Sequence, residues 1–244
     1  LAKGYRELLT RVRKDMGDRK IVIAGENMSE TYADLQDIQL TAHSDQDPNS
    51  LPLFQSVIKD ATIEFGLTMR RDESLDMDCF AARTGFALAR GRQLGWINFD
   101  QGDMLDSVYT NQVDFLRKCA HCRRAGLDFL LYGEFLRTPV VQAGPMQSVK
   151  WDMTKPNYTL NPVMAEAYKS IKGDLGITAV NITNQQRKAE FTLNFKDWPI
   201  EKGKTYNLSI WRDNKWSEPT VFTAKDKLAV DIEAYEPILI KLSK

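Results

Sequence analysis

The 244-residue sequence lacks net charge, because its 33 Lys and Arg residues are balanced by 33 Asp and Glu residues. A chain with no strong field of either sign has little electrostatic attraction for nucleic acid or an anionic membrane surface. Long apolar runs are also missing, since none approaches the about 20 residues that a membrane-spanning helix needs. We therefore expect neither nucleic acid nor a membrane as a partner. With 43% hydrophobic residues, the chain can still bury a sizeable core.

Residues that ligate metals or form disulfides are scarce, with two histidines and three cysteines in the whole chain. Cys79, Cys119 and Cys122 are too few and too unevenly spaced for a disulfide framework. Cys119 and Cys122 flank His121, but a zinc site would need a second pair of ligands. We expect no metal and no cofactor, and we interpret the Cys-Ala-His-Cys stretch as a partly buried helix face.

Residues 1–145 alternate short apolar runs with longer helix-like segments, and this alternation predicts a parallel sheet covered by helices. The segment after the first run, AGENMSE, lacks the glycine pattern of a phosphate-binding loop, which disfavours an independent open α/β sheet. Four strands are half of a closed (β/α)8 barrel. The apolar runs are IVIAG from residue 21, DIQLTA from 37, LPLFQSVI from 51 and RQLGWINF from 92.

Residues 146–244 have a different pattern, which consists of short strand-like runs broken by Asn, Asp, Gly and Pro. Such runs at close spacing predict an antiparallel β domain, and the length suits a sandwich of about 100 residues. The stretch VQAGPMQSVKWDMTKPNY is the expected connection between the two parts. The predicted strands are LGITAVNIT, KAEFTLNF, KTYNLSIW, TVFTA, LAVDI and PILIKL.

Several phrases resemble one known group of proteins: GENMSETYADLQD, LPLFQSVIKDATIEFG, GRQLGWINFD, FLLYGEFLRTP and LGITAVNITNQQRKAEFTLNF. Together they are similar to the C-terminal half of a bacterial family of uncharacterised glycoside-hydrolase-like proteins. The resemblance implies the second half of a TIM-type (β/α)8 barrel followed by an antiparallel β-sandwich. It also implies a carbohydrate substrate and a periplasmic or secreted location. The chain begins with Leu1 and enters a helix directly, so we expect the first half of the barrel upstream, as its partner.

The first apolar run ends in Glu26, which is the main catalytic candidate. Barrel active sites lie at the C-terminal ends of the strands, so a side chain just after IVIAG is expected to face the substrate cleft. Glycoside hydrolysis generally uses two carboxyl groups, one as an acid and one as a nucleophile or base. The resemblance implies that Glu26 is the acid and that its partner carboxylate lies upstream of Leu1. The chain alone is then expected to be inactive.

Glu30 is the alternative catalytic residue, because it lies in the same loop or in the first turn of the next helix. Ser29-Glu30-Thr31 also fits a helix start, where an acid interacts favourably with the helix dipole. A structural role stays open for both glutamates.

The ends of the other runs provide predicted substrate-binding residues. Amide and carboxylate groups can hydrogen-bond to sugar hydroxyls, and the apolar face of a pyranose can lie against an aromatic ring. The alternatives are a solvated loop for His43 and barrel core for Trp96. The predicted substrate-binding set is Asn27, His43, Asp45, Asp60, Trp96, Asn98 and Asp100.

Two functions follow from the sequence: a glycoside hydrolase-like protein, or a non-catalytic module that binds carbohydrate or a partner. Trp198, Trp211 and Trp216 could line a sugar-binding surface of the second part, but their positions in strands and turns favour packing. Four further β/α units upstream, with an acid after the fourth strand, would favour the enzyme.

Overall fold

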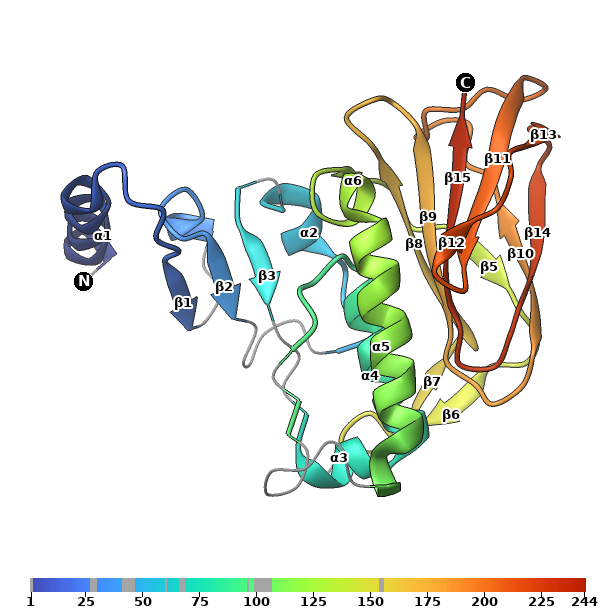
Figure 1. The fold of residues 1–244 in the computed structure, drawn as a ribbon, viewed down its shortest axis with the longest axis horizontal. Coiled ribbons are helices and arrows are strands. Elements are labelled where there is room, and N and C mark those ends of the chain that lie inside the picture. Colours follow the sequence, from blue (N-terminus) through green and yellow to red (C-terminus); the bar gives the residue numbers. More distant parts are fainter. Residues whose placement is uncertain are drawn as a thin grey trace.

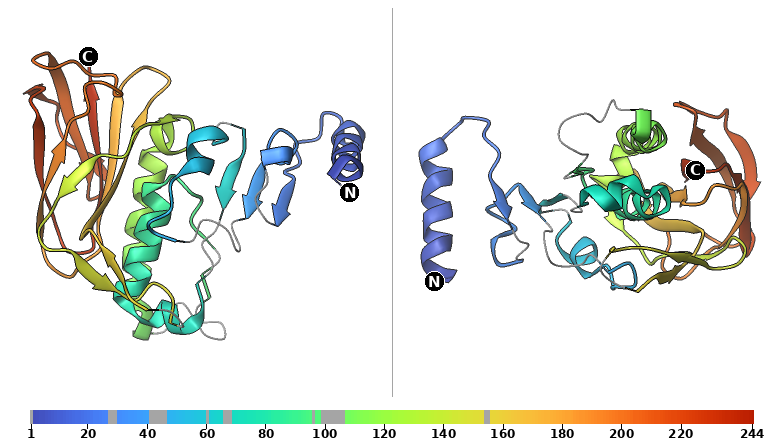
Figure 2. Two further views of the ribbon diagram at one scale, coloured as in Figure 1. Left: turned by 180° about the vertical axis from the view of Figure 1, so that it is seen from behind. Right: turned by 90° about the horizontal axis from the view of Figure 1, so that it is seen from below.

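The computed structural model describes most of the chain, and it has a mixed α/β fold. Helix α1 (Ala2–Met16) and a small parallel sheet lie at one end, helices fill the middle, and antiparallel sheets form the other end (Figure 1). The view from below shows the same order of layers (Figure 2). The described residues are 2–26, 30–40, 47–59, 61–65, 69–95, 97–98, 107–153 and 156–244.

The parallel sheet consists of β1 (Ala24–Glu26), β2 (Ile38–Leu40) and β3 (Ile63–Phe65), paired in chain order. Two isolated parallel bridges, from Phe65 to Gln93 and from Met69 to Ile97, continue this order into the run RQLGWINF. Strands that run in one direction have their carboxyl ends at one edge of the sheet. The predicted parallel sheet is confirmed.

The third predicted strand is wrong, because LPLFQSVI contains helix α2 (Leu53–Val57) and β3 follows it. The amide of Gln55 in α2 donates to the carboxylate of Glu64 in β3, and Arg92 Nη2 lies 2.7 Å from the other Glu64 oxygen, Oε1. The inward-facing residue of β3 is therefore Glu64, whose charge is balanced by a residue distant in the sequence. The sequence of β3 does not show the apolar pattern from which a strand is predicted.

Helix α4 (Met77–Ala89) is the centre of the molecule, and its residues from Cys79 to Ala89 are all buried. A helix buried on all sides is typical of the centre of a protein core. It packs against α3 (Arg71–Leu75), α5 (Thr110–Ala125) and the antiparallel strands. The Oδ1 of Asp76 caps its start by accepting from the backbone N–H of Cys79 at 2.9 Å. α4 and α5 are two of the helix-like segments expected among the apolar runs of residues 1–145. Shorter helical elements are η1 (Glu30–Tyr32), η3 (Ser107–Tyr109) and α6 (Leu127–Leu130).

The Cys-Ala-His-Cys stretch lies on α5, with Cys119 and Cys122 fully buried and His121 exposed, as predicted for a helix face. Burial raises the pKa of Cys79, the third free cysteine, to about 12. Within the described part of the chain, no cluster of three His, Cys, Asp or Glu side chains could hold a metal ion. The described helices are all too short or too polar to span a bilayer.

The antiparallel strands form two main sheets that share one core of buried side chains. One sheet has the order β12-β11-β15-β9-β8-β4, with β13 paired to β11, and the other has the order β14-β10-β5; β6 and β7 pair separately. All six predicted strands are confirmed, whereas the sequence did not identify β8. The bounds are β4 (Glu134–Phe135), β5 (Val140–Gln142), β6 (Gln147–Val149), β7 (Tyr158–Leu160), β8 (Val163–Lys169), β9 (Leu175–Asn181), β10 (Arg187–Thr192), β11 (Thr205–Arg212), β12 (Lys215–Trp216), β13 (Thr220–Thr223), β14 (Lys227–Ile232) and β15 (Pro237–Ser243).

The antiparallel pairing begins before residue 145. Strand β4 pairs with β8, and β5 pairs with β10. The stretch expected to be a connection also contains a paired strand, because β6 lies within it and pairs with β7, which begins at its last residue, Tyr158. The division into 1–145 and 146–244 stays a prediction.

Three buried arginines connect α4 and the residues after it to other layers through ion pairs. Arg83 Nη1 lies 3.4 Å from Glu73 Oε1 in α3, and Arg90 Nε lies 3.8 Å from Glu166 Oε1 in β8. The Arg92–Glu64 pair connects to β3. Removing one partner of a buried pair typically costs about 3 to 5 kcal/mol, because the remaining charge is left in a low-dielectric site.

The close contact between α4 and β9 leads to a stability prediction. A Cβ on Gly85 would lie 3.0 Å from Ile182 Cγ2 and 3.1 Å from Val180 Cγ1. We expect Gly85→Val to lower the free energy of unfolding by about 1 to 3 kcal/mol through overpacking, measured by urea denaturation. Gly4→Val on α1 is the control, since a Cβ on Gly4 would meet no described atom within 4 Å. Similar losses in both variants would contradict this account of the packing.

Candidate functional site

The predicted active edge is the carboxyl edge of the parallel sheet, and Glu26 lies there as the last, exposed residue of β1. Its strand is held from two sides. The side chain of Gln36 occupies the space that a Cβ on Gly25 would need. The Oδ2 of Asp37 accepts from the N–H of Ile23 at 2.7 Å and lies 2.7 Å from Arg13 Nη2 in α1. These contacts fix the course of β1, at whose end Glu26 lies.

Asn98 is the second described residue of the predicted site, and it is also exposed. Its N–H donates to the carbonyl oxygen of Met69 at 3.1 Å, which holds it at the end of the fourth parallel segment. β1 and this segment are separated by β2 and β3, so across a flat sheet the two residues would be about 14 Å apart. Glu26 and Asn98 could therefore contact different parts of an extended ligand.

Most of the other predicted site residues lie outside the part of the chain that the structure describes. Glu30 is the first residue of η1, which agrees with the helix-start alternative for Ser29-Glu30-Thr31. The predicted residues outside the described part of the chain are Asn27, His43, Asp45, Asp60, Trp96 and Asp100.

Chemically, the described edge offers one exposed carboxylate, that of Glu26. The acid of the neighbouring strand β3, Glu64, is buried and bound to Arg92 and Gln55. A single carboxyl group can donate or accept a proton, whereas glycoside cleavage generally takes a pair. The described edge therefore contributes at most one member of such a pair.

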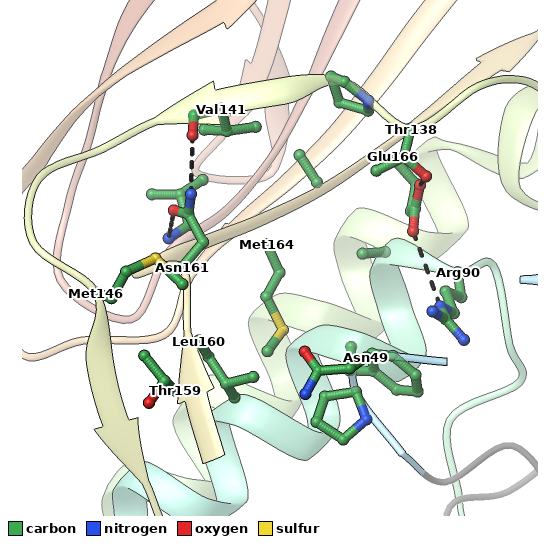
Figure 3. Close-up of a pocket in the computed structure, with 16 residues that line it drawn as sticks. Asn49, Arg90, Thr138, Val141, Met146, Thr159, Leu160, Asn161, Met164 and Glu166 are labelled. Carbon is green, nitrogen blue, oxygen red and sulfur yellow. Dashed lines mark hydrogen bonds and ion pairs between the residues drawn. The ribbon is translucent and has the colours of Figure 1, made fainter. Parts of the chain in front are cut away.

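A cavity of about 290 Å³ lies apart from this edge, between α4, β8 and the segment containing β5 to β7 (Figure 3). Glu166 and Arg90 point toward each other at one end of it. Thr138 Oγ1 donates to Glu166 Oε2 at 2.6 Å. At the other end, Asn161 Nδ2 donates to the carbonyl oxygen of Val141 at 2.8 Å. The cavity joins groups from both parts of the chain.

The electrostatics of this cavity centre on Glu166, whose side chain is almost fully buried. Burial raises the pKa of Glu166 to about 7, although the Thr138 hydrogen bond and the Arg90 charge both lower it. Arg90 is also held by Ser50, since its Nη1 donates to Ser50 Oγ at 3.1 Å, and its guanidinium lies 4.2 Å from the centre of the Phe86 ring. Glu166 can therefore exchange a proton near neutral pH.

The sequence did not identify Glu166, Arg90 or Thr138 as a group. Arg90 follows α4, Thr138 lies between β4 and β5, and Glu166 lies in β8, so no local spacing connects them. One signal was available: Glu166 interrupts the apolar run VMAEAYK, and an acid in an otherwise buried strand needs a partner.

Comparison with known proteins points to glycoside hydrolases. No protein-family model matches the chain. A Bacteroides thetaiotaomicron protein named "Putative glycoside hydrolase" is 27% identical over 191 residues, which cover 75% of this chain and 27% of that protein. The chain thus spans about a quarter of the length of this relative.

Two solved α-amylase structures show a similar fold. A maltogenic α-amylase from Thermotoga neapolitana matches with a TM-score of 0.52 and 13% identity, over 98% of this chain and 59% of that chain. An Anoxybacillus α-amylase matches with a TM-score of 0.53 and 12% identity, over 100% of this chain and 56% of that chain. The mixed α/β fold therefore resembles that of glycoside hydrolase structures, as the sequence resemblance implied.

The raised pKa of Glu166 predicts a pH-dependent stability. Because its folded pKa of about 7 lies above the ordinary value of 4.5, the folded state binds the proton more tightly. The stability that this group contributes is complete below about pH 4.5 and is lost as the pH rises through about 7. Relative to Glu166→Gln, the wild-type free energy of unfolding should fall by about 2 to 3 kcal/mol across this range.

Urea unfolding of both proteins between pH 4.5 and 8 measures this difference. Glu134→Gln is the control, because Glu134 is an exposed glutamate that pairs with Lys169. Its profile should run parallel to that of the wild type. A constant difference between the wild type and Glu166→Gln over the whole range would show that the carboxyl does not titrate there.

Proposed function

We propose that the chain is the second half of a (β/α)8 barrel followed by an antiparallel β-sandwich, and that it belongs to a glycoside hydrolase-like protein acting on carbohydrate. The observation that carries the proposal is the parallel order of β1, β2 and β3, continued by the bridges to Gln93 and Ile97. Barrel enzymes build their active sites at the carboxyl edge of such strands. The relative from Bacteroides thetaiotaomicron supports carbohydrate as the substrate class.

In this proposal Glu26 is the general acid. It is exposed at the carboxyl edge, where a bound glycoside could reach it. Among the described strands, β1 pairs with β2 alone, which leaves its other side for a strand of the first barrel half. The nucleophilic or basic carboxylate would come from that half. Residues 1–145 and 146–244 remain the proposed domains. The proposed sugar-binding residues are Asn27, His43, Asp45, Asp60, Trp96, Asn98 and Asp100.

The surface around α1 supports a docked first half. Tyr5, Leu8 and Val12 follow one another at helical spacing and are 41%, 54% and 37% exposed. Ile21 and Val22, which lead into β1, are also exposed. A helical apolar stripe normally packs against another element, and contiguous exposed apolar surface marks an interface. Figure 2 shows α1 and β1 together at the end of the molecule farthest from the antiparallel sheets. A β/α unit of the first half could cover both.

Replacing Glu26 tests its proposed role in the intact protein. Glu26→Gln keeps the shape of the side chain but removes its titratable proton. General acid catalysis is typically worth about 10²- to 10⁴-fold, so turnover of glycosides with poor leaving groups should fall by that order. Activated aryl glycosides should lose less, since their leaving groups need little protonation. Steady-state kinetics on both substrate types measures the difference.

Glu30→Gln is the matched control and should leave both activities largely intact. Equal losses on the two substrate types would indicate that Glu26 binds rather than protonates. Loss with Glu30→Gln instead would transfer the role to Glu30. If neither variant loses activity, the alternative of a module that binds carbohydrate or a partner without catalysis is favoured.

A pair of leucines tests the docked first half. Leu8 is exposed in this chain, so Leu8→Ala should change the free energy of unfolding of the 244-residue chain by less than about 1 kcal/mol. In the intact protein, where the first half would bury it, the loss should rise to about 2 kcal/mol or more. Leu9 is the control, because it is already buried and Leu9→Ala should destabilise both proteins. Equal effects of Leu8→Ala on both would argue against docking at α1.

A further inference from the structure

A second cavity, of about 550 Å³, opens between α5 and the turns at one end of the antiparallel sheet. Helix α5 packs against β11 and β15 and runs beside this sheet (Figure 1). The floor of the cavity contains Trp211 and Glu236, which are 5% and 7% exposed. This cavity shares no lining residue with the one around Glu166. It also lies on different elements from the parallel edge that carries Glu26.

One wall of the cavity is a tight hairpin turn fastened to α5. Asp213 and Asn214 join β11 to β12, and both have the left-handed backbone conformation, with φ of 48° and 63°. Two such residues are typical of a type I′ turn. Asn214 Oδ1 lies 2.5 Å from His121 Nδ1, and because the amide oxygen can only accept, Nδ1 carries the proton. This hydrogen bond fixes the distance between the hairpin and the helix.

The polar residues at the floor of the cavity are also held in place, by hydrogen bonds and an ion pair. Glu236 Oε2 accepts from the N–H of Glu233 at 2.8 Å and lies 3.5 Å from Arg212 Nη2. The same Nη2 donates to the carbonyl oxygen of Asp231 at 2.6 Å. Trp211 lies opposite Trp216 of β12 and Leu239 of β15 in the sheet register. The polar groups of the floor are therefore positioned before any ligand binds, which limits the entropy lost on binding.

The charges around the cavity are balanced. Arg117, Lys118 and Arg212 are cations. Asp213, Glu233 and Glu236 are acids that line the same space. A small anion would be attracted by the first group and repelled by the second, and the reverse holds for a cation. The arrangement favours a neutral ligand with many hydrogen-bonding groups.

Planar polar side chains beside an indole ring suit a sugar. Guanidinium, amide and carboxylate groups can each form two hydrogen bonds with a pair of adjacent hydroxyls. The indole of Trp211 is 5% exposed and packs in the hydrophobic core, so it closes the floor of the cavity while the polar side chains provide the contacts to the sugar. Ligand pockets typically measure about 300 to 1,000 Å³, and this cavity falls in that range.

We propose that this cavity between α5 and the β11–β12 hairpin is a second carbohydrate-binding site, which takes a neutral mono- or disaccharide. The proposal depends on the side chains that line the cavity and not on the catalytic role of Glu26. The sequence assigned His121 to a helix face and Trp211 to packing. In this proposal both residues line one site.

Titration of the 244-residue chain with maltose and with xylobiose tests the proposal. Calorimetry gives the affinity, and amide chemical shifts in NMR spectra identify the residues that respond. We expect at least one sugar to bind, with shifts concentrated on α5 near His121 and on the hairpin. Arg117→Ala and Asn214→Gly should each weaken the affinity about tenfold, which corresponds to one lost hydrogen bond to a charged or well-placed group.

Arg117→Ala removes one lining side chain and leaves the hairpin in place, whereas Asn214→Gly also removes the hydrogen bond to His121 and therefore tests the position of the hairpin wall. Arg117 is exposed on α5, and glycine at 214 tolerates the left-handed backbone of the turn. Arg124→Ala is the matched control, since Arg124 is exposed on the same helix but does not line the cavity, and it should leave the affinity unchanged. Thermal unfolding of each variant checks the fold.

Three results would overturn the proposal. The first is that neither sugar shifts the cavity amides at up to about 50 mM, well above the millimolar Kd of a weak site. The second is that inorganic phosphate, titrated in parallel, binds there while both sugars fail, which would make this an anion site. The third is sugar binding that neither Arg117→Ala nor Asn214→Gly weakens, which would place the sugar elsewhere on the chain.

Discussion

The buried ion pairs of Arg83, Arg90 and Arg92 are the interactions on which the arrangement of this molecule depends. Each joins α4, or the residues just after it, to a different layer: α3, β8 and β3. A buried charge without its partner is strongly unfavourable, so the layers cannot shift independently without separating a pair. Hydrophobic packing around α4 supplies most of the driving force, whereas the pairs specify which surfaces meet. The position of the parallel sheet relative to the antiparallel sheets follows from them.

The two ends of the molecule differ in how completely their apolar surface is buried. The antiparallel end has a closed core and holds the hairpin and α5 in fixed positions through His121 and Asn214. The parallel end has short strands and an apolar helix face that the described residues leave exposed. Glu26 lies at this second end, where the proposed chemistry needs a further carboxylate. The proposed sugar-binding cavity is therefore preorganised, whereas the proposed catalytic edge has one of the two carboxylates that it needs.

Much of the fold could be predicted from the sequence, because apolar periodicity reports directly on burial. It identified α1, α4, α5, the parallel order of the first strands and six antiparallel strands. It failed at α2 and β3, where Glu64 occupies an inward position and is held by Arg92 and Gln55. The same limit applies to sites. Glu26 was proposed from its place after a strand and stays a prediction, whereas Glu166 and Arg90 are brought together by packing between distant segments.

The pairing of β5 with β10 has a consequence for how the chain folds. Val140 lies opposite Thr192, so one sheet cannot close until a strand far along the chain has been made. Contacts of this kind carry a loop-closure entropy that must be overcome before they contribute stability, and they slow folding. During synthesis, β5 leaves the ribosome well before its partner. Its edge is unpaired with β10 in that interval, and an unpaired strand edge can pair with other chains.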